Sequence, residues 1–153
     1  MKTNIKIRKA TKKDLDILAK LDLGYCLYEN SLDKRIEIPT IKELRITTEK
    51  YMKLGTVYFI AEESKIPLGY ISINFCLQGR EHTGVIHTLF IDEKARGRGI
   101  GNMLVQYVFD LFKKNKCTRV RSFMHIANRN AQAFWKKQGF ELEEGYTASR
   151  RMK

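Results

Sequence analysis

The segment DEKARGRGIGNML, residues 92–104, brings small and basic residues together where a helical pattern begins. Its alternating glycines are Gly97, Gly99 and Gly101, and its arginines are Arg96 and Arg98. The first-turn N–H groups of a helix favour a bound anion, and glycines let a phosphate approach the backbone closely. Guanidinium groups add charge-assisted donors. The segment therefore predicts a cradle for a pyrophosphate group.

Three phosphate-binding patterns compete for this segment. A P-loop requires a Lys-Ser or Lys-Thr pair, which does not follow Gly101. A dinucleotide fingerprint requires glycine where the chain has Asn102, and an acidic residue about 20 positions further on, where the chain reads CTRVR. The pattern R/Q-x-x-G-x-G/A fits Arg96, Gly99 and Gly101. A plain tight turn is the alternative, but it does not need glycines, arginines and a helix start together.

The charge of the chain indicates an anionic partner. Its 153 residues carry a formal net charge of +12 at pH 7. Residues 76–153 hold 15 Lys or Arg against 7 Asp or Glu, so the excess lies in the half with the glycines. A phosphorylated cofactor and nucleic acid both satisfy this charge. Nucleic acid is not expected, because the predicted helix 100–115 carries its basic pair, Lys113 and Lys114, only at its end.

Composition and cysteine spacing restrict the class of protein. Hydrophobic residues make up 43% of the chain, and the longest apolar runs are too short to span a bilayer. No apolar stretch follows the basic start, so we expect a cytoplasmic protein with no membrane partner. The cysteines are widely spaced and form no CxxC or Cys/His cluster, which predicts buried thiols and no metal site. They are Cys26, Cys76 and Cys117.

The pattern of apolar residues predicts a mixed α/β domain. Alternation and β-branched residues indicate strands, and apolar spacing of three or four residues indicates helices. The expected strands are 5–10, 56–63, 66–77, 84–92, 117–126, 140–144 and 146–152. The expected helices are one from Thr11 to Gly24, then 40–54, 100–115 and 128–138. A strand–helix–strand unit inside an antiparallel meander gives a mixed sheet.

Two segments resemble the GNAT superfamily of acetyl-CoA-dependent N-acetyltransferases. LFIDEKARGRGIGNML is similar to the family's signature, which runs from its fourth strand through the pyrophosphate loop into a helix. NRNAQAFWKKQGF is similar to the family's later motif. The resemblance implies an acyl-CoA N-acyltransferase fold of the α/β (α+β) class in one domain, residues 1–153. Its mixed, mainly antiparallel sheet would have six to seven strands, with about four helices. Acetyl-CoA would be the acetyl donor, and no metal is implied.

The resemblance also assigns residues to the donor. Backbone N–H groups and two guanidinium groups would hold the pyrophosphate; these residues are Arg96, Gly97, Arg98, Gly99, Ile100, Gly101 and Asn102. The backbone of Leu89, Phe90 and Ile91 would pair with the pantetheine arm. Asn128 matches the family's Asn that contacts the same arm.

A backbone donor and a base would carry the chemistry. In the family, an unpaired N–H of the fourth strand polarises the thioester carbonyl, here near Leu89 or Phe90. Many members use a Glu of that strand as the base, but this strand has His87 as its candidate, with an ordinary pKa close to operating pH. Strand alternation predicts that His87 points to the same side as Val85 and Leu89. A packed, hydrogen-bonded His87 without a catalytic role is the alternative.

The general acid has weaker support in the sequence. Trp135 stands where the family often has Tyr, and an indole does not donate a proton, so we expect Trp135 to be wall or core. Tyr146, Tyr107 or water would then protonate the leaving thiolate. The missing Tyr leaves a catalytically silent acyl-CoA-binding module as an alternative to an enzyme.

The acceptor side corresponds to residues 24–39, by resemblance to the family's first two helices and their loop. Tyr28 and Glu29 are the candidates selected there, and Glu29 would hold an ammonium group or act as a remote base. A solvated loop is the alternative. Further candidates are Tyr25, Asn30 and Asp33. The acceptor would be a primary amine of a small molecule, peptide or protein that attacks the thioester directly in a ternary complex. Homodimerisation through the last strands is compatible with the sequence.

Overall fold

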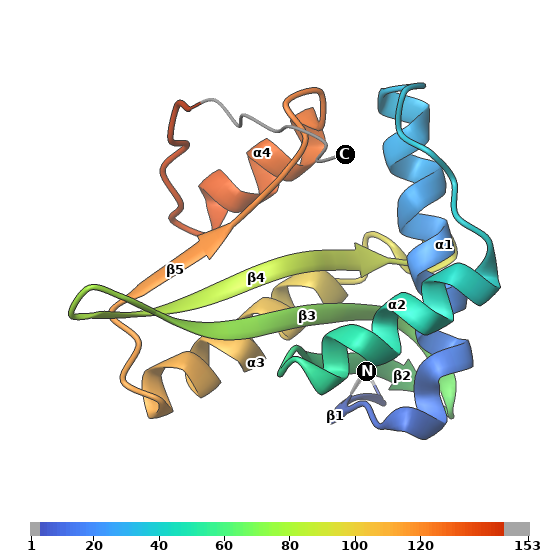
Figure 1. The fold of residues 1–153 in the computed structure, drawn as a ribbon, viewed down its shortest axis with the longest axis horizontal. Coiled ribbons are helices and arrows are strands. Elements are labelled where there is room, and N and C mark those ends of the chain that lie inside the picture. The colour runs from blue at the N-terminus through green and yellow to red at the C-terminus, as the bar shows by residue number, and fades with distance from the viewer. Residues whose placement is uncertain (1–3, 146–153) are drawn as a thin grey trace, which may run out of the picture. The chain divides into compact units, whose positions relative to one another are not determined.

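The computed structural model describes residues 4–145, apart from the side chain of Gln78 (Figure 1). These residues form two compact units, and the boundary in the chain lies between Phe123 and Met124. The first unit contains β1 (Ile5–Lys9), η1 (Lys12–Asp14), α1 (Leu15–Leu32), α2 (Ile41–Lys53), β2 (Val57–Glu63), β3 (Ile66–Gln78), β4 (Glu81–Ile91), η2 (Glu93–Ala95), α3 (Ile100–Lys114) and β5 (Arg119–Ser122). The second unit contains α4 (Arg129–Lys137).

The sheet follows the chain, in the order β1-β2-β3-β4-β5. Each neighbouring pair is antiparallel except β4 and β5, which are parallel and joined through α3. The predicted mixed, mainly antiparallel sheet is therefore confirmed. The strand number is wrong, because the described chain has five strands rather than six or seven. Residues 140–144, expected as a strand, form no backbone ladder, and their expected partner, 146–152, lies outside the described residues.

The two faces of the sheet pack against different helices. On one face, Tyr58, Tyr70 and Phe90 form a cluster with Leu18 and Leu21 of α1. On the other face, Phe59 meets Tyr107 of α3 edge-on, with ring centroids 5.0 Å apart, and Phe75 meets Phe112 of α3 at 5.5 Å. Figure 1 shows α2 and α3 on opposite sides of the strands. We call these two sides the α1 face and the α3 face.

Gly24 does not end the first helix, contrary to the sequence prediction. α1 continues without a break to Leu32, eight residues beyond the expected stop. A Cβ at position 24 would lie 2.8 Å from Cζ of Phe90, so the glycine is required where α1 approaches β4 closely. Gly24, which the sequence suggested as the end of the helix, instead allows the helix to pack closely against Phe90. Tyr28 and Glu29 consequently lie on a helix and not in a loop.

The boundaries of α2 agree with the prediction. Thr40 caps the helix: its Oγ1 accepts from the Glu43 N–H at 3.2 Å, and Glu43 Oε2 accepts from the Thr40 N–H at 2.7 Å. Such a reciprocal pair satisfies two N–H groups that the helix leaves without partners. Gly55 follows the helix with φ of +100°, a conformation that glycine adopts without strain.

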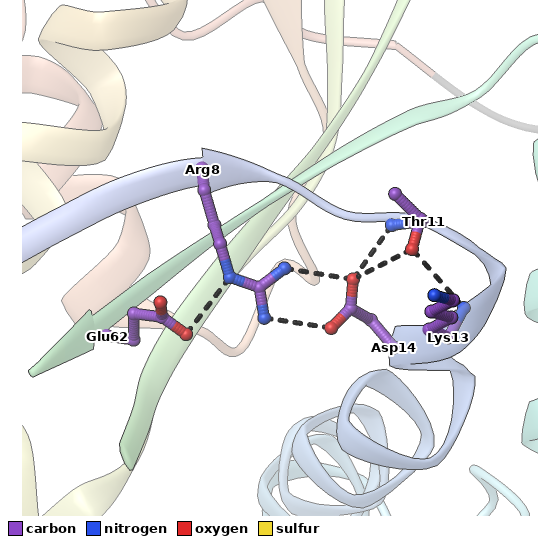
Figure 2. A network of polar contacts seen from close by, with 5 residues as sticks. All are labelled: Arg8, Thr11, Lys13, Asp14 and Glu62. Atoms are coloured by element: carbon purple, nitrogen blue, oxygen red, sulfur yellow. Dashed lines mark hydrogen bonds and ion pairs between the residues drawn. The ribbon is translucent and has the colours of Figure 1, made fainter. Parts of the chain in front are cut away.

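A charged network fixes the start of α1 to the first two strands (Figure 2). Asp14 Oδ2 and Oδ1 accept from the Arg8 guanidinium at 2.9 and 2.8 Å, and Oδ2 also accepts from the Thr11 N–H at 2.8 Å. Arg8 Nε lies 3.0 Å from Glu62 of β2. Asp14 is only 6% exposed, and its hydrogen bonds from Arg8 hold the pKa of its carboxyl below the usual value. Arg8 of β1 therefore joins the start of α1, through Asp14, to β2, through Glu62.

Asp14→Asn is expected to lower the free energy of unfolding by about 1–3 kcal/mol at pH 7, because the substitution removes the charge that accepts two hydrogen bonds from Arg8 and leaves only Glu62 to pair with it. The folded pKa lies below the unfolded value of about 3.9, so the ionised carboxylate stabilises the fold above that pH. This contribution is lost as the pH falls through the folded pKa. Urea titrations at pH 7 and at descending acidic pH measure the difference between variant and wild type.

Asp16→Asn is the matched control, because the Asp16 side chain is 67% exposed and pairs only with the half-exposed Arg45 among the ion pairs of residues 4–145. Its loss should stay within about 0.5 kcal/mol. Equal losses for the two variants, or an Asp14→Asn loss that does not shrink at acidic pH, would contradict the role given to Asp14.

Candidate functional site

The outer edge of β4 is only half covered by β5. β4 pairs with β3 from Glu81 to Ile91, but with β5 only from Thr83 to Ile86. Beyond Ile86, no strand within the described chain pairs with the second edge of β4, and Figure 1 shows β5 diverging there. Buried backbone N–H and C=O groups need partners, so an unpaired strand segment can accept an extended ligand. This divergence agrees with the unpaired N–H of the fourth strand that the family resemblance implies.

Two backbone amides of β4 face this open edge. The Asp92 N–H donates to the Leu68 carbonyl of the neighbouring chain segment at 2.9 Å, and N–H directions alternate along a strand. Phe90 therefore bonds toward β3, while Leu89 and Ile91 direct their N–H groups to the open edge. The Ile91 carbonyl agrees with this assignment, because it accepts from Arg96 Nε at 3.1 Å on the same side. Of the two amides expected to polarise a carbonyl, Leu89 fits the geometry and Phe90 does not.

A β-bulge at His87 marks the point where the edge opens. Ser72 pairs with Thr88 and Ile73 pairs with Ile86, which leaves His87 as an extra residue in β4. A bulge bends the strand and increases its twist. The pairing with β5 ends at Ile86, one residue before the bulge. The bulge and the loss of pairing therefore occur together.

The bulge also separates residues that alternation placed together. Val85 pairs with Asn74, and His87 Nε2 lies 2.8 Å from Asn74 Oδ1, so both side chains lie on the α1 face. Leu89 pairs with Ile71, whose side chain belongs to the α3 face. The prediction that His87 shares a face with Val85 is correct, and the prediction that it shares one with Leu89 is wrong. The physical reason is the extra residue, which reverses the alternation after position 87.

His87 has the features of a base that is neutral near pH 7. Asn74 Oδ1 accepts from Thr56 Oγ1 at 2.8 Å and lies at the same distance from His87 Nε2. With Asn74 as acceptor, Nε2 carries the hydrogen and Nδ1 is left to accept a proton. The residue is exposed, yet partial desolvation of its ring lowers the pKa below the ordinary 6.5. The imidazole is therefore mostly unprotonated at neutral pH.

The glycine segment turns from β4 into the first turn of α3. Gly97 and Gly99 have φ of +77° and +76°, and Gly99 is the N-cap of α3. The first helical hydrogen bond joins the Met103 N–H to the Gly99 carbonyl at 3.1 Å, so the amides of Ile100 and Gly101 precede the helical ladder. A left-handed loop leading into a helix N-terminus is a site that favours anions. This geometry agrees with the predicted cradle, which also includes Asn102 in the same first turn.

Both arginines of the segment already have protein partners. Arg98 Nη2 contacts Glu63 at the end of β2 at 2.9 Å. Arg96, besides its bond to the Ile91 carbonyl, places its guanidinium 5.4 Å from the ring centroid of Tyr28 and 5.8 Å from that of Phe90. Arg96 therefore connects the end of β4 to α1. Arg98 reaches a phosphate only by leaving or sharing Glu63.

The inner surface of α1 carries polar groups that the sequence analysis did not connect. Asp22 Oδ1 accepts from the buried Tyr70 hydroxyl, and the Tyr25 hydroxyl is hydrogen-bonded to Glu29. Burial raises the pKa of Asp22 and Tyr25, and raises the pKa of Cys26 to about 11. Asp22, Tyr25 and Glu29 are separated by three, four and seven residues, and this spacing places side chains on one face of a helix. The sequence did not reveal this common face, because Gly24 was interpreted as the end of the helix.

The second unit contributes a capped helix and an aromatic group. The Asn128 side-chain oxygen accepts from the Ala131 N–H at 3.0 Å, so Asn128 is the N-cap of α4. Trp135 packs against Phe134 and Phe140, with ring centroids 5.1 and 4.8 Å apart, as expected for a wall or core residue. The contact of Asn128 with pantetheine stays a prediction. Tyr146, the predicted acid, lies outside the described residues.

Residues 4–145 offer no group of ligands for a metal ion and no helix that could span a membrane. Their His, Cys, Asp and Glu side chains form no group of three or more that could hold a metal ion. None of their helices combines the length and apolar character needed to cross a bilayer. All three cysteines are free thiols, but the prediction that they are buried is wrong, because Cys26 and Cys117 are partly exposed and Cys76 is exposed.

Comparison with known proteins gives one family. Residues 26–140 match the family model described as the acetyltransferase (GNAT) family. An uncharacterised N-acetyltransferase of Methanocaldococcus jannaschii is 32% identical over 92 residues, which cover 57% of this chain and 40% of that protein. A mycothiol acetyltransferase of Corynebacterium jeikeium is 31% identical over 62 residues, covering 40% of this chain and 18% of that protein. The match thus spans less than half the length of these relatives.

The fold is also found in solved structures. A possible acetyltransferase from Clostridium difficile 630 superposes with a TM-score of 0.83, at 17% sequence identity, over 97% of this chain and 99% of the other. At this identity, the likeness supports the fold alone. The expected acyltransferase fold is confirmed, with the correction to five described strands.

Proposed function

Because the chain belongs to the acetyltransferase (GNAT) family, we propose that it moves an acetyl group from acetyl-CoA to a primary amine. The observation that carries this proposal is the open edge of β4 followed directly by a left-handed glycine loop and the N-terminus of α3. A ligand with an extended arm and a pyrophosphate matches these two features: the arm fits the open edge of β4, and the pyrophosphate fits the glycine loop and the N-terminus of α3. Acetyl-CoA has both parts, and supplies an activated acyl group with a thiolate leaving group.

The donor would bind in two places. The amides of residues 97–102 would donate to the pyrophosphate, aided by the helix dipole of α3. Ile91 would pair with the pantetheine arm through its N–H group, which β5 does not cover, as an added strand pairs with a sheet edge. The Ile91 carbonyl already accepts from Arg96, so the N–H group is the donor proposed for the arm.

Transfer would need one donor and one base from this chain. The Leu89 N–H would hydrogen-bond the carbonyl oxygen as negative charge develops there, an effect worth a few kcal/mol in other enzymes. His87 Nδ1 would accept the proton that the amine loses as its nitrogen bonds to the acetyl carbon and the C–S bond breaks. The thiolate would take a proton from Tyr146 or from water. Tyr107 is less suitable, because it packs against Phe59 on the α3 face.

One observation favours a second candidate, a catalytically silent acyl-CoA-binding module. Trp135 occupies the position where the resemblance suggests a proton-donating Tyr, and an indole cannot fill that role. The silent module predicts acetyl-CoA binding without thiol release in the presence of amines. A cytoplasmic location, one domain over residues 1–153 and a homodimer stay predictions from the sequence.

Gly99→Asp is expected to weaken acetyl-CoA binding at least about tenfold, measured by titration calorimetry, because a carboxylate would face the pyrophosphate. Asp and Asn both tolerate positive φ and both cap helices, so neither variant should unfold the protein. Gly99→Asn is therefore the matched control, with the same shape and no charge, and should lose much less affinity. Equal affinities for Gly99→Asp and wild type would contradict the cradle.

His87→Gln tests the base through the pH dependence of kcat/KM, followed as thiol release with the best substrate of an amine panel. The base must be unprotonated, and its pKa is lowered, so wild-type activity should fall only as the pH drops below about 6.5. The variant should lose about a hundredfold in rate together with this acidic limb. If the variant keeps the wild-type profile, His87 is not the base.

A further inference from the structure

Glu29 on α1 is a buried carboxylate with an incomplete set of partners. The residue is 9% exposed, and its Oε1 is buried without a hydrogen-bond partner in the described part of the chain. The Tyr25 hydroxyl is hydrogen-bonded to the same carboxylate. A buried carboxylate is normally paired, because taking an unpaired charge out of water is costly. This oxygen can therefore accept from a donor group of a bound ligand, and a cation would also compensate the buried charge.

The surroundings of Glu29 add negative charge. Asp22 lies two turns earlier on the same helix, about 10 Å along its axis, and accepts from Tyr70. None of the ion pairs found between residues 4 and 145 includes Asp22 or Glu29, although the chain carries a net charge of +12. We call Asp22, Tyr25 and Glu29 the acidic face of α1. In a basic protein, such a face is suited to a positively charged ligand.

The acidic face lies beside the open edge of β4. The Tyr25 ring meets the Phe90 ring edge-on, with centroids 6.4 Å apart, and Gly24 lets the helix approach this same ring. One turn further, Tyr28 contacts Arg96, which bonds to the last carbonyl of β4. Figure 1 shows the end of β4 directed at α1. A cation on Glu29 would thus lie one helical turn beyond Tyr25, whose ring contacts Phe90 of the strand segment proposed to hold the thioester.

We propose that Glu29, oriented by Tyr25, binds the ammonium group of the acceptor. The acceptor class is then an amine with no carboxylate beside the amino group, because Asp22 and Glu29 would repel a second anion. Arg96 is not placed to bind that carboxylate, since its Nε is bound to the Ile91 carbonyl and its guanidinium lies over the rings of Tyr28 and Phe90. This inference rests on the proposed function, and adds to it the binding group and the chemical class of the substrate.

The test compares amines with the amino acids that carry one additional carboxylate: tyramine with tyrosine, cadaverine with lysine, and histamine with histidine. Thiol release from acetyl-CoA is measured for wild type, Glu29→Gln and Glu141→Gln. Glu141 is the matched control, an exposed Glu that follows α4 and lies outside residues 24–39. Wild type should prefer each amine to its amino acid at least tenfold in kcat/KM. Glu29→Gln should raise the KM for the best amine at least tenfold and leave the KM for acetyl-CoA unchanged, while Glu141→Gln changes neither.

Two further measurements distinguish a loss of amine binding from a loss of folding stability. The melting temperature of Glu29→Gln should equal or exceed that of wild type, because the variant removes a buried charge without a cation. Tyr25→Phe should raise the KM for the amine in the same direction, with a smaller change in kcat, because it removes only the group that orients Glu29.

The outcomes distinguish this inference from the proposed function. If wild type releases thiol with amines but Glu29→Gln keeps the wild-type KM for them, Glu29 is not the binding group and the acetyltransferase proposal stands. If amino acids are the better substrates, the proposed class is wrong. If acetyl-CoA binds but no amine releases thiol, both proposals fall and the silent module is supported.

Discussion

The candidate site depends on the loss of one backbone ladder. β4 is held by β3 over its whole length, but β5 leaves it after Ile86, so Leu89 and Ile91 keep N–H groups directed at an edge that no strand of residues 4–145 covers. A sheet normally satisfies such groups within the protein. The bulge at His87 bends β4 at the same point, and so links the opening of the edge to the position of the candidate base.

Three glycines bring two other segments, α1 and the turn into α3, to this edge for two different reasons. Gly24 has no side chain where α1 crosses Phe90, and this close approach brings the acidic face of α1 to the end of β4. Gly97 and Gly99 have open space around them but positive φ, and this conformation turns the chain from the strand into α3. The first glycine is needed for packing, and the other two for backbone geometry.

Features encoded by neighbouring residues could be predicted from the sequence, and features set by distant contacts could not. The start of α2 after Thr40 and the start of α3 at Ile100 depend on residues a few positions apart, and both predictions are confirmed. The bulge at His87 depends on pairing with β3, and the ion pair of Arg98 with Glu63 joins residues 35 positions apart. The role of Gly24 likewise depends on Phe90, so the helical spacing of Asp22, Tyr25 and Glu29 could not be recognised while Gly24 was read as a stop.

Residue-resolved amide hydrogen exchange tests most directly whether the open edge of β4 holds the acetyl donor. Saturating acetyl-CoA should slow exchange at Leu89 and Ile91 at least tenfold. Phe90, whose N–H is directed at β3, should change much less. Unchanged exchange at both Leu89 and Ile91, under conditions where acetyl-CoA is shown to bind, would contradict the account.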